Sequence, residues 1–198
     1  MENIIRQTTE FAMHIVRAYV NPGDTVIDAT CGNGHDTLAL ARMEPAQLYA
    51  FDVQEAAVRA TAQLLEASGY DDAIAEGRFV LAQLGHEKLK GFCEERGCEE
   101  ASVKAAVFNL GYLPGGSKEI TTATGTTLTA VQGAMELLAP NGLICITMYS
   151  GHPEGRREKD ALLALAEGLD AGQWHTAFIG MPNQKHNPPE ILLITRKN

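Results

Sequence analysis

The stretch VIDATCGNGHDTLALA, from Val26 to Ala41, decides the fold of this chain. It runs from an apolar strand through a glycine-containing turn into an apolar helix. Gly32 and Gly34 suit a tight turn that lets a ligand approach the backbone, and the helix after it directs amide groups and its positive end at a negative group. A dinucleotide-binding turn would read GxGxxG, but Thr37 stands where the third glycine would be. The stretch therefore predicts a ligand site of the Rossmann type, without the NAD signature.

Outward from this turn, short apolar runs alternate with helical patterns. Strands are predicted near Thr25–Ala29, Gln47–Phe51, Arg78–Leu81, Ala105–Phe108, Leu143–Met148, Thr176–Ile179 and Ile191–Thr195. Helices are predicted near Asp36–Arg42, Gln54–Ser68, Glu87–Arg96, Thr126–Leu138 and Glu158–Leu169. Such alternation is typical of βαβ units. The predicted fold class is therefore α/β, Rossmann-like, with a seven-stranded, mostly parallel sheet covered by helices on both faces.

Before the first strand, apolar residues recur at helical spacing until Asn21, Pro22 and Gly23 end the pattern. These residues are Ile4, Ile5, Phe11, Ile15, Val16 and Tyr19. We expect an amphipathic helix within residues 1–22 that packs on the core. With 198 residues and 45% hydrophobic content, residues 1–198 are expected to form a single domain.

Composition narrows the cellular setting. No stretch approaches the roughly 18 apolar residues of a membrane span, and the first ten residues lack the apolar core of a secretory signal. We expect a cytoplasmic protein with no membrane partner. Cys31, Cys93, Cys98 and Cys145 show neither a CxxC pattern nor Cys/His ligand spacing, so the sequence predicts no disulfide framework and no metal site.

The formal net charge of −9 argues against a polyanionic partner, but the charge is uneven. Residues 1–109 hold 9 Lys and Arg against 17 Asp and Glu, whereas residues 110–198 hold 7 against 8. A surface that faces phosphate is therefore expected in the second half. The candidates are Lys118, Arg156, Arg157, Lys159 and Lys185, with ordinary solvated charges as the alternative.

Two acidic residues indicate the ligand. Asp28 lies four residues before Gly32, and this D-x-x-x-G-x-G arrangement is similar to that of methyltransferases that use S-adenosylmethionine (SAM). SAM carries an amino cation and a sulfonium, which favour carboxylate neighbours. Asp52 ends the strand LYAFD 18 residues after Gly34, near the spacing expected for a carboxylate that accepts both ribose hydroxyls. The predicted cofactor is SAM.

The third strand ends in FVLAQLGH, where adenine would lie in this fold. Gln83 or Leu84 could contact the base, and His86 begins the next helix. The sequence does not separate an adenine contact from a helix cap for these residues. The cofactor-binding residues predicted altogether are Asp28, Thr30, Gly32, Asn33, Gly34, His35, Asp36, Thr37, Asp52, Val53, Gln54, Gln83, His86 and Asn109.

A candidate reaction site follows the fourth strand. Asn109–Leu110–Gly111–Tyr112 resembles the [DNS]-P-P-[YF] motif of methyltransferases that act on amino nitrogen, with Leu110 and Gly111 in place of the two prolines. A neutral amide at Asn109 can accept the hydrogens of an amine and point its lone pair at the methyl group, without favouring the protonated ammonium as a carboxylate would. Tyr112 could stack on a flipped-out base. The alternatives are a turn-capping asparagine and a core tyrosine.

Two later segments are expected to close the same pocket. MYSGHPEGRREKD follows strand five and brings Tyr149 and His152 to the carboxyl end of the sheet. MPNQKHNPPE joins the last two strands and contains Lys185 and His186. The predicted catalytic residues are Asn109, Leu110, Tyr112 and His152, and the predicted substrate-binding residues are Gly111, Tyr112, Tyr149, His152, Lys185 and His186. For both histidines a turn or core role is the alternative to proton transfer.

Four motifs, DATCGNGHDTLALA, FNLGYLPGG, MYSGHPEG and MPNQKHNPPEILLI, together resemble the bacterial family known as rRNA methylases, over almost the whole chain. The resemblance implies SAM-dependent N-methylation of the aminomethyl group of 5-aminomethyl-2-thiouridine at the tRNA wobble position. It also implies that residues 28 and 32–37 form the cofactor loop, that Asp52 binds the ribose, and that residues 109–112 form the catalytic loop. The expected partner is then the tRNA anticodon arm.

Other functions stay open at this stage. The methyl acceptor could be rRNA, a protein side chain or a small amine. The same sheet could serve a nicotinamide oxidoreductase, or a SAM-binding protein without catalysis. Because the domain is small and acidic and carries no appended RNA-binding module, a homodimer is expected to extend its RNA-binding surface.

Overall fold

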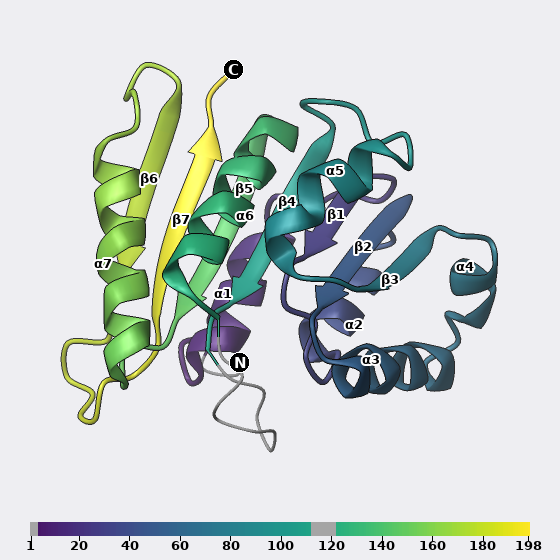
Figure 1. Ribbon diagram of the computed structural model, residues 1–198, viewed down its shortest axis with the longest axis horizontal. Coiled ribbons are helices and arrows are strands. Elements are labelled where there is room, and N and C mark those ends of the chain that lie inside the picture. Colours follow the sequence, from purple (N-terminus) through teal and green to yellow (C-terminus); the bar gives the residue numbers. More distant parts are fainter. Residues whose placement is uncertain (1–3, 112–121) are drawn as a thin grey trace.

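A seven-stranded sheet forms the centre of the computed structural model, which describes residues 4–111 and 122–198 (Figure 1). The strand order is β3-β2-β1-β4-β5-β7-β6. The strands are β1 Thr25–Asp28, β2 Gln47–Asp52, β3 Phe79–Gln83, β4 Val103–Asn109, β5 Leu138–Met148, β6 Trp174–Ile179 and β7 Glu190–Arg196. This confirms the predicted α/β class.

The strands β1 to β5 run parallel, whereas β7 pairs antiparallel with both β5 and β6. From β1 the chain builds outward through β2 to β3, and it then crosses to the other side of β1 to build β4 and β5. The direction of building therefore changes between β1 and β4. In open α/β sheets the carboxyl ends of the strands at such a switch point form the ligand crevice.

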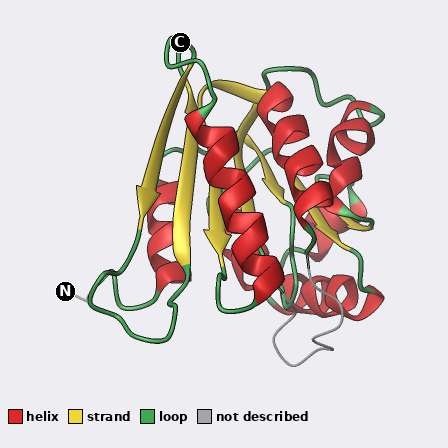
Figure 2. Cartoon of the chain, turned by 60° about the vertical axis from the view of Figure 1, so that its left-hand side comes forward, coloured by secondary structure: helices red, strands yellow, loops and turns green. Residues whose placement is uncertain are grey.

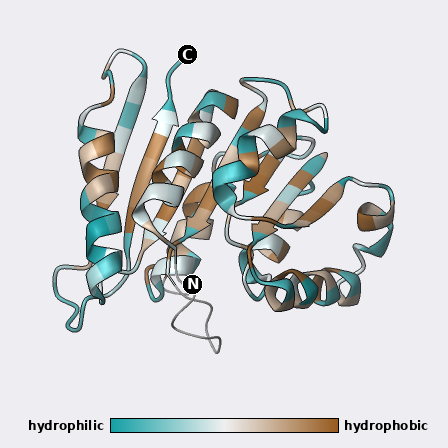
Figure 3. Cartoon of the chain, viewed as in Figure 1, coloured by the Kyte–Doolittle hydropathy of each residue, from teal (hydrophilic) through white to brown (hydrophobic). Residues whose placement is uncertain are grey.

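Helices cover both faces of the sheet (Figure 2). They are α1 Thr8–Arg17, α2 His35–Ala41, α3 Glu55–Ala67, α4 Asp71–Ala75, the 3₁₀ turn η1 His86–Lys88, α5 Leu89–Glu94, α6 Thr124–Leu137 and α7 Pro153–Glu167. Apolar residues of α1 to α4 pack in one core cluster, and those of α5 to α7 pack in another on the opposite face. The central strands are accordingly the most hydrophobic part of the chain (Figure 3).

The opening helix is shorter than predicted. It begins at Thr8 and ends at Arg17, whereas Ile4 and Ile5 precede it and are about half exposed, at 49% and 51%. Their spacing matched the helical pattern, but neither side chain is buried in the core. Ala12 and Val16 instead provide the buried face of α1.

Three other predicted elements have different bounds in the structure. The helix predicted near Glu87–Arg96 divides into η1 and the short α5. The strand predicted from Leu143 begins at Leu138, directly after α6. The helix predicted from Glu158 begins at Pro153, since a proline fits the first turn of a helix where no amide partner is needed.

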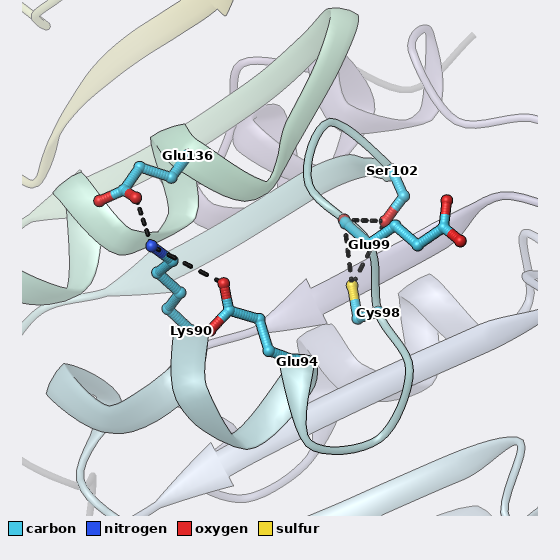
Figure 4. A network of polar contacts seen from close by, with 6 residues as sticks. All are labelled: Lys90, Glu94, Cys98, Glu99, Ser102 and Glu136. Atoms are coloured by element: carbon cyan, nitrogen blue, oxygen red, sulfur yellow. Dashed lines mark hydrogen bonds and ion pairs between the residues drawn. The ribbon is translucent and has the colours of Figure 1, made fainter.

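A polar network joins α5 to α6 beside the sheet (Figure 4). Lys90 on α5 forms ion pairs with Glu136 on α6 and with Glu94 one turn further along its own helix. Beyond α5, the Oγ of Ser102 donates to the Glu99 carbonyl at 2.6 Å and lies 3.4 Å from the Cys98 Sγ. All four cysteines are free thiols, as the sequence indicated.

Within residues 4–111 and 122–198, none of the helices has the length and apolar character needed to cross a bilayer.

Candidate functional site

A cavity of about 700 Å³ opens at the carboxyl ends of β1, β2 and β4, at the switch point of the sheet. Most of the residues predicted from the sequence line it. These are Thr30, Gly32, Asn33, His35, Asp36, Asp52, Val53, Gln54, His86, Asn109, Leu110, Gly111 and Tyr149. The cavity therefore joins the glycine turn to the loop after β4, although the two are far apart in the sequence.

The glycine turn is held close to α3. Gly34 has a φ of 84° and precedes α2 as its N-cap. A Cβ added at this position would lie 2.8 Å from the Cα of Thr61, too close for any side chain. The hydroxyl of Thr61 donates a hydrogen bond to the Gly32 carbonyl at 3.1 Å. Thr61 thus fixes the turn from the far side, a role that no sequence motif indicated.

Asp28 lies beneath the turn rather than in the cavity wall. Its carboxylate is 1% exposed and accepts hydrogen bonds from the Thr37 hydroxyl at 2.6 Å and the Thr30 amide at 3.1 Å. Burial, and then the nearby charge of Asp36, raise the pKa of Asp28 to about 7. Thr37, buried and outside the cavity lining, serves here to hold Asp28.

Asp52 ends β2 in the cavity wall. Its Oδ2 accepts from the Gly32 amide at 3.1 Å, and its Oδ1 accepts from the Gln54 amide at 2.9 Å. Each carboxylate oxygen has a second lone pair, so Asp52 can still accept two hydrogen bonds from a ligand. The carboxylate therefore combines a fixed position with the capacity to bind vicinal hydroxyls.

Asn109 ends β4 on the opposite side of the cavity. Its backbone amide donates to the Thr30 hydroxyl at 2.7 Å, and the following amide of Leu110 donates to the Thr147 carbonyl at 2.9 Å. Its side-chain Nδ2 donates to the carboxylate of Asp36. Its Oδ1 is buried and has no hydrogen-bond partner among the described residues. An acceptor left in this state costs about 1–3 kcal/mol unless a ligand satisfies it.

The far rim of the cavity is anchored to α7. Gly111 and Thr122 exchange two hydrogen bonds, from the Gly111 amide to the Thr122 hydroxyl at 3.0 Å and from the Thr122 amide to the Gly111 carbonyl at 3.1 Å. The Thr122 hydroxyl in turn donates to Glu158 at 2.9 Å. Glu158 is 2% exposed and also accepts from Thr127, and burial raises its pKa. This buried carboxyl fixes the rim from behind.

Three residues were considered for the adenine contact, and two of them line the cavity. Leu84 and His86 line the cavity, and His86 is buried, so burial lowers its pKa. Gln83 does not line it, because its exposed side chain donates to the Val53 carbonyl at 3.4 Å. His86 begins η1, as predicted.

Several predicted residues lie away from the cavity lining. The Nδ1 of His152 accepts from the Gly155 amide at 3.1 Å, so this histidine caps α7. Lys185 and His186 are exposed in the connection between β6 and β7. Tyr112 and Lys118 lie outside the described residues. The roles predicted for these five side chains stay predictions.

Seven lining residues were not predicted from the sequence. They are Thr9, Ala29, Cys31, Glu87, Thr122, Ala123 and Thr126. Thr9 comes from α1, at the start of the chain, and no local pattern connects it with a ligand site. Glu87 could have been found, since it directly follows His86 at the start of η1.

The lining fits a cationic ligand. Three acids, Asp36, Asp52 and Glu87, contribute to it, whereas no Lys or Arg does among the described residues. Asp28 adds a fourth carboxyl just below the wall. SAM carries net positive charge, and its size suits a cavity of this volume. Asp52 offers acceptors for its ribose, and the acidic surroundings favour its amino and sulfonium cations.

Comparison with known proteins shows the family to which the chain belongs. Residues 48–195 match the family model described as "Putative rRNA methylase". The chain belongs to this family. Residues 6–87 also match the model of the ribosomal protein L11 methyltransferase. A curated relative, the chloroplastic tRNA (mnm5s2U34)-methyltransferase of Arabidopsis thaliana, is 37% identical over 98% of this chain and 71% of its own length.

Two solved structures resemble this member of the rRNA methylase family over almost its whole length. One, described as an rRNA methylase from Clostridium thermocellum, has a TM-score of 0.85 and 32% identity, covering 96% of this chain and 98% of its own. The other, described as a methyltransferase from Streptococcus mutans in complex with SAH, has a TM-score of 0.81 and 31% identity, covering 99% of both chains. The protein is a SAM-dependent methyltransferase with a class I fold.

Proposed function

We propose that this methyltransferase acts on the amine of a 5-aminomethyl group on the wobble uridine of tRNA, using the anticodon arm as substrate. The observation that carries the proposal is the buried Oδ1 of Asn109, an acceptor without a partner among the described residues. A primary amine brings the hydrogens that such an acceptor lacks. The Arabidopsis thaliana relative is named for U34 of tRNA, which supports the same class of substrate.

SAM, when bound, supplies a methyl group activated by its sulfonium cation. Asp52 would hold the ribose by accepting its hydroxyls, since each carboxylate oxygen keeps a free lone pair beside its bond to the amide of Gly32 or Gln54. Asp28, below the turn, balances the positive charge of the donor from a distance. These residues would hold the donor on one side of the cavity and would leave the side of Asn109 for the acceptor.

Asn109 orients the acceptor nitrogen. Its Oδ1 accepts one N–H of the amine, so that the nitrogen lone pair is directed toward the methyl carbon, and in-line displacement needs this alignment at about 3 Å. The amide is neutral, so it does not stabilise the ammonium form, which has no lone pair. Asn109 itself therefore does not oppose the loss of the proton that frees the nitrogen lone pair.

Other residues complete the acceptor side. Gly111 and Tyr149 line the cavity beside Asn109 and are suited to contact the uridine. Lys159 is committed to Glu190 at 2.5 Å, and Arg157 pairs with Glu154 at 3.2 Å. Arg156 and Lys185 are exposed and have no such ion pair among the described residues, so they are the better candidates for contacts with the RNA backbone.

The test is methyl transfer to defined RNA. Purified protein is incubated with SAM and an anticodon stem-loop that carries 5-aminomethyl-2-thiouridine, and the nucleosides are analysed by mass spectrometry. We expect one added methyl group on the modified uridine, and none on a matched stem-loop with unmodified uridine. Transfer to rRNA, to protein or to free amines with no transfer to the stem-loop would contradict the proposal.

Binding of the RNA gives a second check. Contacts to phosphate predict that affinity for the stem-loop falls steeply as salt concentration rises. Affinity that does not change with salt would instead favour a small-molecule amine as the substrate.

A further inference from the structure

The side chain of Asn109 has two chemically opposite ends, and only one of them suits an amine acceptor. The Oδ1 end accepts hydrogen bonds, whereas the Nδ2 end donates them and would compete with the hydrogens of the amine. Rotation of the amide by half a turn exchanges the two ends with little change in shape. A methyltransferase that relies on this residue therefore needs a group that selects one orientation.

Asp36 is in position to make that selection. Its carboxylate only accepts hydrogen bonds when ionised, and it takes one from the Nδ2 of Asn109. The backbone of Asn109 is held independently by Thr30, so the contact with Asp36 acts on the side chain alone. The contact with Asp36 leaves Oδ1 as the end without a partner among the described residues.

We propose that Asp36 is a positioning residue, which fixes the Asn109 amide with its oxygen toward the acceptor amine. This inference rests on the proposed function, because it assigns to Asp36 a task in amine methylation. A hydrogen bond to the negative carboxylate also polarises the amide and makes its oxygen a stronger acceptor. Asp36 thus acts on the substrate through Asn109, and it needs no contact with the donor.

The alternative role for Asp36 is binding of the cofactor, since it lies in the first turn of α2, directly after the glycine turn, and lines the same cavity. The two roles predict different outcomes in a double-mutant cycle. If Asp36 acts through Asn109, its removal matters only while Asn109 is present. If Asp36 binds the donor, its removal weakens donor affinity in either background.

The experiment measures kcat and KM for the aminomethyl stem-loop, and Kd for SAH, in D36A, D36N, N109A and D36A/N109A. We expect D36A to lower kcat by about 10²-fold with little change in the Kd for SAH, since misplacement of a reacting group can cost that much. D36N should lose less, because an amide at this position can still accept the bond from Nδ2. In the N109A background, D36A should change kcat by less than about threefold. D160N, which removes an exposed acid on α7, is the control and should leave kcat unchanged.

Losses that multiply in the double mutant, or a Kd for SAH that weakens as much as kcat/KM falls, would overturn the inference. A second readout does not depend on the substrate. The side-chain NH₂ resonance of Asn109, assigned by its loss in N109A, should move on D36A substitution, and an unmoved resonance would also overturn the inference. If the wild-type enzyme transfers no methyl group to the stem-loop, the proposed function fails, while this resonance still decides whether Asp36 orients the amide.

Discussion

The two sides of the cavity are built in different ways. The side proposed for the donor draws two carboxylates, Asp28 and Asp52, from residues 28–54, and both are already bonded to nearby backbone amides. The acceptor side is assembled from Asp36, residues 109–111, residues 122–126 and Tyr149, and it leaves a buried amide oxygen without a partner among the described residues. Under the proposed function, the donor side is thus organised before any ligand arrives, whereas the acceptor side would be completed by the substrate.

The largest expected effect is a loss of catalytic rate on substitution of Asn109, with donor binding unchanged. Asn109→Ala removes the acceptor for the amine but leaves the donor side intact. We expect kcat to fall by about 10³-fold, equivalent to about 4 kcal/mol of transition-state stabilisation, while the Kd for SAH changes by less than about threefold. Single-turnover methylation and calorimetry with SAH provide the two measurements. If kcat and the affinity for SAH fell by equal factors, the donor and acceptor sides of the cavity would not be independent.

A smaller effect is expected on stability when a side chain is added to the glycine turn at Gly34. Gly34→Ala should lower the free energy of unfolding by about 3 kcal/mol, because the new Cβ would meet the Thr61 backbone at a φ of 84°. The control is Gly77→Ala, which has a φ of 75° and nothing within 4 Å of the new Cβ. It should cost only about 1 kcal/mol. Urea denaturation of both variants measures the difference, and equal costs would contradict the packing argument.

The donor side depends next on Asp52. Asp52→Ala removes the acceptor for the ribose and leaves the Gly32 and Gln54 amides without their partner. We expect the Kd for SAH to weaken by about 30-fold, or about 2 kcal/mol. The exposed Asp72 on α4 offers a matched control, and its replacement by alanine should leave the affinity for SAH as it is. An unaffected Kd in D52A would remove Asp52 from the donor site.

The same contrast explains what the sequence could predict. The strand, turn and helix from Val26 to Ala41 are local patterns, so the fold and the donor turn followed from them, and Asp52 followed from spacing. The Asp36–Asn109 contact joins residues 73 positions apart, and only the parallel pairing of β1 with β4 brings them together. No local periodicity encodes such a contact.

Two predicted site residues lie outside the cavity lining for equally local reasons. Gln83 or Leu84 was expected near the adenine, and of the two Leu84 lines the cavity, because Gln83 ends the edge strand β3 with an exposed side chain. His152 follows a strand that ends at the cavity, yet Pro153 begins a helix at once, so the histidine caps α7. Successive side chains of a strand point to opposite sides, so Gln83 and Leu84 differ in direction. For His152, the start of the helix sets the direction.

The smallest effect concerns pH. Burial raises the pKa of Asp28 to about 7, so the ligand-free native state holds this proton more tightly than the unfolded state does. Stability of the ligand-free protein should therefore fall as pH rises from about 4 to about 7. A cationic donor favours the ionised carboxylate, so binding of SAM should release a proton and strengthen as pH rises through about 7, by at most about tenfold per pH unit.

Calorimetry in two buffers with different ionisation enthalpies measures this proton release. It should be smaller with SAH, which lacks the sulfonium charge, and absent in D28N. Affinity for SAM that weakens as pH rises from 6 to 8 would contradict the assigned role of Asp28.

The most direct test of the account is a crystal structure of the enzyme with SAH and a stem-loop that carries 5-aminomethyl-2-thiouridine. The account predicts that the Asn109 Oδ1 lies about 3 Å from the substrate amine nitrogen, with Nδ2 still bonded to Asp36. An amine bound elsewhere, or an Asn109 amide that presents Nδ2 to the substrate, would contradict it.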